Sequence, residues 1–313
     1  MTAVAPLDDQ DLTEAAPRGR GPKDRDKTAT RLLRSAAKNS YDPLLDIDWD
    51  APVGQFQAFM PLERCSLYGT PMWDEMTHEQ RIELSKQELA SIAGTGLWFE
   101  IILIQMLARY AYHQDPQAPH TQFALTEIGD ETRHVIMFAK AIEAMGCPTY
   151  RPPAYIHHLA RVYKATARGP ALFAPVLVAE EVTDRLQRVT MNDEDINPLI
   201  RMVNRIHVVE EARHVTFARE EVARVMPTLG PLGRQVTNLV SALVAAFVVH
   251  SLINPEVYTH VGLDKKAAVK AARTNPNNHA TRRWLGERIM GFLDEQGMVT
   301  AVSKPIYKLV HLI

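Results

Sequence analysis

Cysteine is almost missing from this chain of 313 residues, which contains only Cys65 and Cys147, in unrelated contexts. Two such residues give no disulfide framework and no thiolate metal motif, so a reducing cytoplasm is the expected location. The chain also lacks an excess of one charge, because its formal net charge is only −2. It begins without a basic stub followed by an apolar run. We therefore expect neither a nucleic-acid partner nor a secretory signal.

A long uninterrupted apolar run is missing as well. The stretch from Val236 to Ile253 approaches the length of a membrane span, but threonine, asparagine, serine and histidine residues interrupt it. Interrupted stretches of marginal length are usually buried helices of globular proteins. The stretch therefore predicts a core or dimer-interface helix, a homodimer, and no association with a membrane.

Alternation of period two, which would indicate strands, persists nowhere, whereas helical periodicity runs from residue 77 onward. Thr77 and Gln80 predict a capping box at the start of the first long helix. Gly94 and Gly96 lie inside that helix and need a local reason, such as a bulge or room for a ligand, because glycine costs about 1 kcal/mol relative to alanine. The fold class is therefore all-α, with main helices expected over 77–113, 121–145, 152–169, 170–191, 198–226 and 231–253.

Composition divides the chain into four parts. Residues 1–40 are rich in Ala, Pro, Gly, Asp and Arg and predict a mobile N-terminal arm. Residues 41–76 are aromatic, proline-bearing and aperiodic, which indicates an irregular segment that wraps the body. Residues 77–255 form the expected helical bundle, and residues 256–313 form a C-terminal helical extension packed on it.

Two segments carry the same metal-binding spacing, Glu-x-x-His, on separate predicted helices. They are Glu131 with His134 and Glu211 with His214. Residues three apart differ by about 60° around a helix, so each pair shares one face and can reach the same ion. Both pairs lie among apolar residues, where a carboxylate must be paired or bound to a cation.

Two further carboxylates complete the order Glu, Glu-x-x-His, Glu, Glu-x-x-His that is typical of ferritin-like di-iron bundles. Glu100 lies in the middle of the apolar stretch LWFEIILIQML. Glu180 lies on the face that Val176 begins, while the adjacent Glu181 points about 100° away, so we prefer Glu180. The pattern predicts a ferritin-like four-helix bundle with additional helices, in which these side chains hold two iron ions.

His207 adds a seventh candidate ligand. It precedes Glu211 by four residues and His214 by seven, which places it within about 40° of each of them on the same helix face. A lone buried histidine is usually a satisfied core residue. Beside a metal cluster, we instead expect His207 to be a third nitrogen ligand.

At these motifs the chain resembles the p-aminobenzoate N-oxygenase-like di-iron oxygenases. The resemblance rests on QR followed by Glu100, on DExxH ending at His134, on VAE ending at Glu180, and on HxxxExxH from His207. It implies a ferritin-like, usually dimeric oxygenase in which the seven residues named above bind iron. It does not carry over a substrate, because no residue for an arylamine pocket can be identified.

Other polar residues are expected near the metals. Asp130 and Glu210 each precede a ligating glutamate, and each is expected either to accept a ring N–H from a histidine on the opposite helix or to form a surface ion pair with a nearby arginine. Asp184 and Thr183 follow Glu180 and are predicted as neighbours of the cluster. Glu127 is one turn before Glu131, and we interpret it as a helix-surface charge.

The function predicted from these residues is a di-iron oxygenase that activates dioxygen and oxidises a small organic substrate by N-oxygenation or hydroxylation. An external electron donor is required, and a manganese–iron pair remains an alternative cofactor. Two other hypotheses stay open. The first is a di-iron acyl desaturase or fatty-acyl hydroxylase, and the second is a non-enzymatic iron-binding ferritin-like protein.

Overall fold

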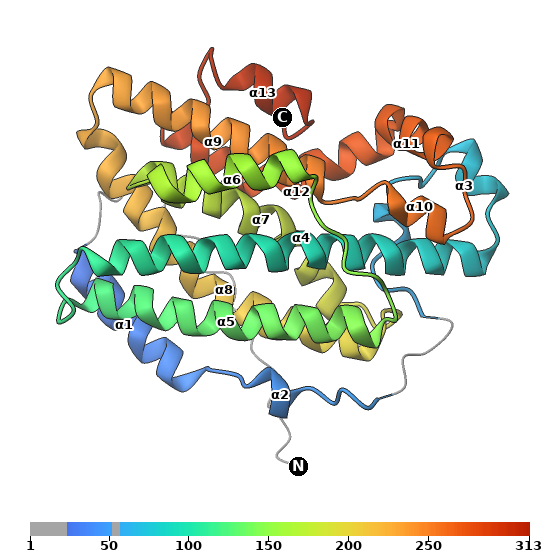
Figure 1. The fold of residues 1–313 in the computed structure, drawn as a ribbon, viewed down its shortest axis with the longest axis horizontal. Helices are drawn as coiled ribbons and strands as arrows, with labels where there is room; N and C mark the ends of the chain where they lie inside the picture. Colours follow the sequence, from blue (N-terminus) through green and yellow to red (C-terminus); the bar gives the residue numbers. More distant parts are fainter. Residues whose placement is uncertain (1–23, 52–56) are drawn as a thin grey trace.

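The computed structural model describes residues 24–51 and 57–313. Within these ranges the regular elements are helices, apart from one isolated bridge between Ala58 and Ile196. Figure 1 shows two long helical hairpins packed side by side, with further helices on one face. The structure confirms the predicted all-α fold class and the helical bundle.

Four long helices form the bundle. α4 and α5 form one antiparallel hairpin, α7 and α8 form the other, and the hairpins meet where α5 packs on α8 and α4 packs on α7 (Figure 1). Their bounds lie within two residues of those expected from the sequence. They are α4 (His78–Tyr112), α5 (Pro119–Ala144), α7 (Pro170–Asn192) and α8 (Pro198–Val225).

The helix ends follow local sequence chemistry. Thr77 Oγ1 accepts a hydrogen bond from the Gln80 N–H at 3.2 Å, and Gln80 Oε1 accepts one from the Thr77 N–H at 3.0 Å. This is the predicted capping box. Proline occupies the first turn of α5, α7 and α8, where its missing N–H has no intrahelical partner to lose.

The outer helices cover the α7 side of the bundle. α9 and α12 both pack against α7, and α6 lies along α4 (Figure 1). α12 has 20 residues, so the C-terminal part holds a longer helix than the short ones expected there. The bounds are α6 (Ala154–Thr166), α9 (Pro231–Ser251), α10 (Glu256–His260), α11 (Lys265–Thr274), α12 (Pro276–Glu295) and α13 (Lys304–Leu309).

The predicted mobile arm is corrected in its second half. Residues 1–23 lie outside the described residues, but α1 (Arg25–Lys38) is a regular helix packed on α5 and α8. Ala29, Leu32 and Ala36 form a narrow buried stripe at helical spacing. Small residues and many charges concealed this stripe from a composition-based prediction.

The segment after α1 runs along the outside of α5 and α8. The Asn39 carbonyl oxygen accepts from Arg213 Nη1 at 3.0 Å, and the Tyr41 N–H donates to Glu210 Oε1 at 3.1 Å. Two short helices and one 3-10 turn follow, and Trp73 is the buried anchor of the last helix. These elements are α2 (Pro43–Asp46), η1 (Leu62–Arg64) and α3 (Pro71–Glu75).

The two glycines inside α4 have different surroundings, which explain their presence in different ways. A Cβ on Gly94 would lie 2.7 Å from the carbonyl oxygen of Tyr150, so the close approach of the chain before α6 requires glycine there. A Cβ on Gly96 would meet only Phe138, at 3.8 Å, and Gly96 lines an internal cavity.

Two segments, His78–Tyr112 and Pro231–His260, are long and apolar enough to cross a membrane by length and composition. About half of each apolar window is buried inside the protein. Core helices of globular proteins meet the same criteria, so this is weak evidence for a span. The packing of both segments against the bundle agrees with the interpretation of 231–253 as a packed helix.

Candidate metal centre

The two Glu-x-x-His pairs meet at the centre of the bundle, where α5 faces α8. His134 Nδ1 lies 3.1 Å from Glu131 Oε2 and 3.2 Å from Glu211 Oε1. His214 Nδ1 lies 2.9 Å from Glu211 Oε1 and 3.0 Å from Glu131 Oε1. All four side chains are buried. Each histidine therefore lies beside the glutamate of its own helix and beside the glutamate of the facing helix.

α4 and the first half of α8 supply the next two donors. His207 Nε2 is 3.3 Å from Glu100 Oε1, and its ring centroid is 4.7 Å from that of His134. His207 Nδ1 is 2.9 Å from Gln187 Oε1. Because a Gln oxygen only accepts, Nδ1 carries the ring proton, and the Nε2 lone pair faces the carboxylates.

α7 supplies one of its two adjacent glutamates. Glu180 has a carboxylate oxygen within 4.8 Å of donor atoms of His207 and Glu211. Glu181 instead turns to Arg219 and pairs with it through both carboxylate oxygens. The structure therefore brings Glu180 to the other six sequence-predicted ligands and directs Glu181 away from them.

The outer carboxylates cross between the two helices. Glu210 on α8 lies 2.9 Å from His134 Nε2 on α5, and Asp130 on α5 lies 3.2 Å from His214 Nε2 on α8. The alternative ion pairs are present too, because Arg213 is 3.2 Å from Asp130 and 3.6 Å from Glu210. A carboxylate only accepts, so each histidine carries a proton on Nε2, while its Nδ1 is turned toward the centre.

The two expected neighbours on α7 have different positions. Thr183 lines the internal cavity, and its hydroxyl donates to the Glu180 carbonyl at 3.0 Å. Asp184 is a correction, because its carboxylate pairs with Arg188 at 2.8 Å and Arg288 at 3.4 Å. It lies one turn further along α7 than Glu180, at a level where it pairs with Arg288 of α12, which packs on α7.

Glu127 was interpreted as a surface charge, and the structure contradicts this. It is 1% exposed, and a carboxylate oxygen lies within 4.8 Å of donor atoms of Glu131 and His214. Its spacing of four residues before Glu131 and seven before His134 puts it on the same helix face. That spacing was the signal that could have identified it.

Burial and mutual repulsion control the ionisation of this cluster. Burial, together with the charges of Glu131 and Glu211, raises the pKa of Glu100 and Glu180 well above the usual range. Burial also lowers the pKa of His207 to about 4, helped by the nearby His134. His207 is therefore neutral at pH 7 and keeps a free lone pair.

The two paired histidines behave in the opposite way. Burial opposes their charge, but hydrogen bonds from His134 to Glu131 and Glu210, and the charge of Glu211 beside His214, raise both histidine pKa values well above the usual range. The second proton of each ring, on Nδ1, lies where a cation would lie, and metal binding would release it.

The donor set fits two metal ions. One oxygen each of Glu100, Glu127 and Glu211 is buried and meets no hydrogen-bond donor among the residues that the structure describes. A buried carboxylate oxygen without a donor is costly unless a cation satisfies it. Imidazole nitrogens with carboxylate oxygens suit iron and manganese.

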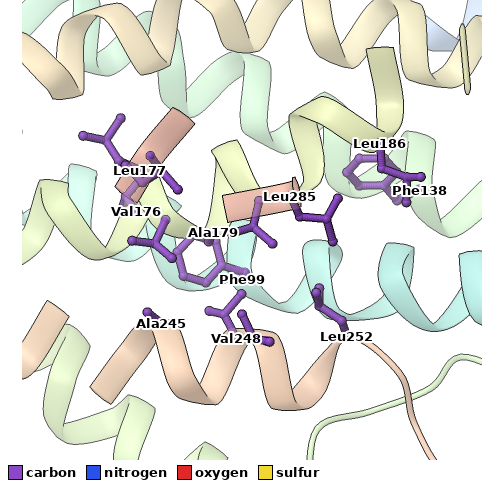
Figure 2. Close-up of a cluster of buried hydrophobic side chains, with 14 of the residues drawn as sticks. Phe99, Phe138, Val176, Leu177, Ala179, Leu186, Ala245, Val248, Leu252 and Leu285 are labelled. Carbon is purple, nitrogen blue, oxygen red and sulfur yellow. The ribbon is translucent and has the colours of Figure 1, made fainter. Parts of the chain in front are cut away.

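An apolar cavity of about 50 Å³ adjoins the cluster on the α9 side. Glu100, Glu180 and His207 form its polar end. Figure 2 shows Phe99 and Ala179 beside Val248 of α9, and Leu252 directly after that helix completes the opposite wall. The volume suits dioxygen or a few water molecules.

A helical bundle with two Glu-x-x-His helices and a glutamate from each of two other helices defines the class of ferritin-like di-metal carboxylate proteins. Within this class, the family model described as P-aminobenzoate N-oxygenase AurF matches residues 22–297. The chain belongs to that family, which confirms the resemblance carried by the motifs.

Two relatives and one solved structure are similar to this chain. An uncharacterized protein of Mycobacterium tuberculosis is 27% identical over 291 residues, covering 89% of this chain and 84% of the relative. A second uncharacterized protein of that species is 29% identical over 213 residues, covering 65% of this chain and 62% of the relative. A mutant R2-like ligand-binding oxidase with a Mn/Fe cofactor has a TM-score of 0.50 at 14% identity, covering 88% of this chain and 93% of its own. This structural likeness supports the ferritin-like fold.

Proposed function

We propose that this protein is a non-haem di-metal oxygenase that uses dioxygen to oxidise a small organic substrate. The observation that carries the proposal is one buried cluster of carboxylates and imidazoles from four helices, with donor-free oxygens at its centre. Its metal ligands would be Glu100, Glu131, His134, Glu180, His207, Glu211 and His214. Two iron ions, or a manganese–iron pair, would supply the electrons that activate dioxygen.

The protein's own residues would set the conditions for that chemistry. Glu131 and Glu211 each lie beside both histidines and would hold metal there. Four ligand carboxylates would balance the charge of two divalent ions, so the loaded site would be close to neutral. Asp130 and Glu210 hold the ring protons on the outer nitrogens, which keeps the inner nitrogens ready to bind.

The apolar wall of the cavity supports an uncharged or apolar substrate region, although its volume of about 50 Å³ must increase to hold an organic molecule. Its wall is mainly aliphatic and aromatic, and none of the described residues that line it is a lysine or an arginine. A substrate carboxylate would have no cationic partner there. Hydroxylation or desaturation of an acyl chain is therefore a second candidate, which the apolar wall specifically favours.

The assembly proposed is a cytoplasmic homodimer. α9 exposes Leu232, Val236, Leu239 and Leu243 at helical spacing on one face. Apolar stripes of this kind are typical of subunit interfaces. Light scattering of this 35.2 kDa chain should give twice the monomer mass. A cage many times heavier would instead support an iron-storage protein.

Metal analysis tests the proposed site. Protein produced with iron should contain about two metal ions per chain, whereas Glu131→Ala and His214→Ala should lose most of that metal. Glu143→Ala, an exposed residue of α5, is the matched control and should retain it. No bound transition metal in the wild type, or full retention in both site variants, would refute the proposal.

The reaction is tested separately. Ferrous protein is prepared without oxygen and then mixed with dioxygen, which it should consume faster when its true substrate is present. Candidate amines and acyl compounds are therefore compared by the rate of oxygen uptake and by the mass of the product. Oxidation of acyl compounds alone would select the second candidate.

A further inference from the structure

A second concave site lies at the end of the bundle where α1 and α7 begin and α4 ends (Figure 1). It is a cleft of about 430 Å³, within the range of small-molecule sites. Its lining combines four arginines with one carboxylate, that of Glu221. The arginines are Arg25, Arg109, Arg168 and Arg224.

The positive charge of this arginine cleft is only partly neutralised. Arg25 pairs with Glu221 at 2.8 Å, and Arg224 pairs with the same carboxylate at 2.6 Å. Among the residues that the structure describes, Arg109 donates to the backbone carbonyls of residues 165 and 167, which carry no charge. Arg168 is exposed at the rim. The cleft is therefore prepared for an anion.

The cleft floor is aromatic and leads to the candidate metal centre. Tyr110 and Phe173 line the cleft, with ring centroids 5.7 Å apart. The next rings follow at similar spacing. The distance between ring centroids is 5.8 Å from Phe173 to Phe217, 5.0 Å from Phe217 to Phe123, and 6.3 Å from Phe123 to His214. An aromatic column of touching rings thus joins the arginine cleft to a proposed metal ligand.

From this juxtaposition we infer that the arginine cleft binds the reductant of the centre, a reduced flavin nucleotide, and that the aromatic column carries its electrons inward. The inference rests on the proposed function. The guanidinium groups would hold the phosphate, and the isoalloxazine ring would lie on the half-buried Tyr110, whose ring packs edge-on against the buried Phe173. A concave site of this size suits a small molecule better than the surface of a carrier protein.

The electron balance selects a flavin over a nicotinamide. A reduced flavin loses two electrons and two protons and can pass its electrons singly, while a nicotinamide transfers a hydride that a column of phenyl rings cannot carry. The two electrons would reduce two ferric ions to ferrous ions. The protons would leave through the open cleft to solvent.

Binding is tested first, with flavin mononucleotide as the probe and quenching of its fluorescence as the readout, on metal-free and metal-loaded protein. Arg168→Glu should weaken binding at least tenfold, because it reverses a charge at the rim. Arg161→Glu, an exposed α6 residue outside the cleft, should bind like the wild type. Riboflavin, which lacks the phosphate, should bind at least tenfold more weakly.

Unchanged affinity in Arg168→Glu, or equal binding of riboflavin and the nucleotide, would overturn the inference. If the wild type takes up no metal when it is produced with iron, but still binds the nucleotide in this charge-dependent way, only the proposed function is refuted. A metal-loaded protein that oxidises substrate yet ignores the nucleotide would refute only the reductant site.

The aromatic column is tested with Phe217→Leu, using Phe59→Leu, a buried phenylalanine outside the column, as the matched control. Anaerobic reduction of the ferric centre by reduced flavin mononucleotide should slow at least tenfold in Phe217→Leu, with nucleotide affinity unchanged. Reduction by a cationic viologen should be the same in both variants. Equal slowing with both reductants would overturn the role of the column.

Discussion

Glu210 should control metal affinity although it is not a proposed ligand. Its Oε2 lies 2.9 Å from His134 Nε2, and its Oε1 accepts the Tyr41 N–H at 3.1 Å, so both oxygens have partners. Glu210→Gln leaves one oxygen for these two donors and removes the negative charge beside the ring. Loss of such an outer partner typically weakens metal binding 10–100-fold, or about 1.4–2.7 kcal/mol.

The assay is competition with a chelator of known affinity, accompanied by chemical unfolding of the metal-free protein. Glu181→Gln is the matched control, because Glu181 is also buried beside a proposed ligand but pairs with Arg219. Both variants should lower the free energy of unfolding, and only Glu210→Gln should lower metal affinity. An affinity within twofold of the wild type, or an equal loss in Glu181→Gln, would refute the reasoning.

Three further predictions follow from other sites. Burial raises the pKa of Glu88 to about 7, so unfolding releases its proton between about pH 4.5 and 7. The free energy of unfolding should therefore fall by up to about 3 kcal/mol as the pH rises through this range. Glu88→Gln should flatten this pH dependence when the free energy is measured by urea unfolding. Gly94→Ala should lower the melting temperature because its Cβ would meet the Tyr150 carbonyl, whereas Gly291→Ala, with open space around it, should raise it. His207→Ala should lower metal content and slow oxygen uptake, and unchanged values for both would favour the desaturase-like alternative.

Periodicity and spacing predicted the bundle and identified candidate ligands that the structure brings together, because both signals are local. Glu131 and His134 share a helix face whatever the tertiary structure, and the repeat of the motif at Glu211 and His214 identified the partner helix. Helix ends were predictable for the same reason, since the Thr77 cap and the first-turn prolines act within one turn.

Features that depend on packing between distant segments were not predictable. α1 has few large apolar side chains, and only its contact with α5 and α8 makes its stripe of small residues sufficient. Asp184 faces α12, a neighbour that its own helix does not reveal. The arginine cleft draws residues from α1, α4, α8 and the loop before α7, so no single stretch of sequence announces it.

The segment after α1 has a consequence for how the protein folds during its synthesis. Tyr41 and Asn39 supply hydrogen bonds to Glu210 and Arg213, yet more than 160 residues separate them along the chain. The ribosome therefore synthesises this segment early and its partners much later. α1 can dock on α5 as soon as α5 has emerged, but the segment after α1 cannot complete its hydrogen bonds until α8 has emerged, so the outer wall of the centre closes only when most of the chain has been translated.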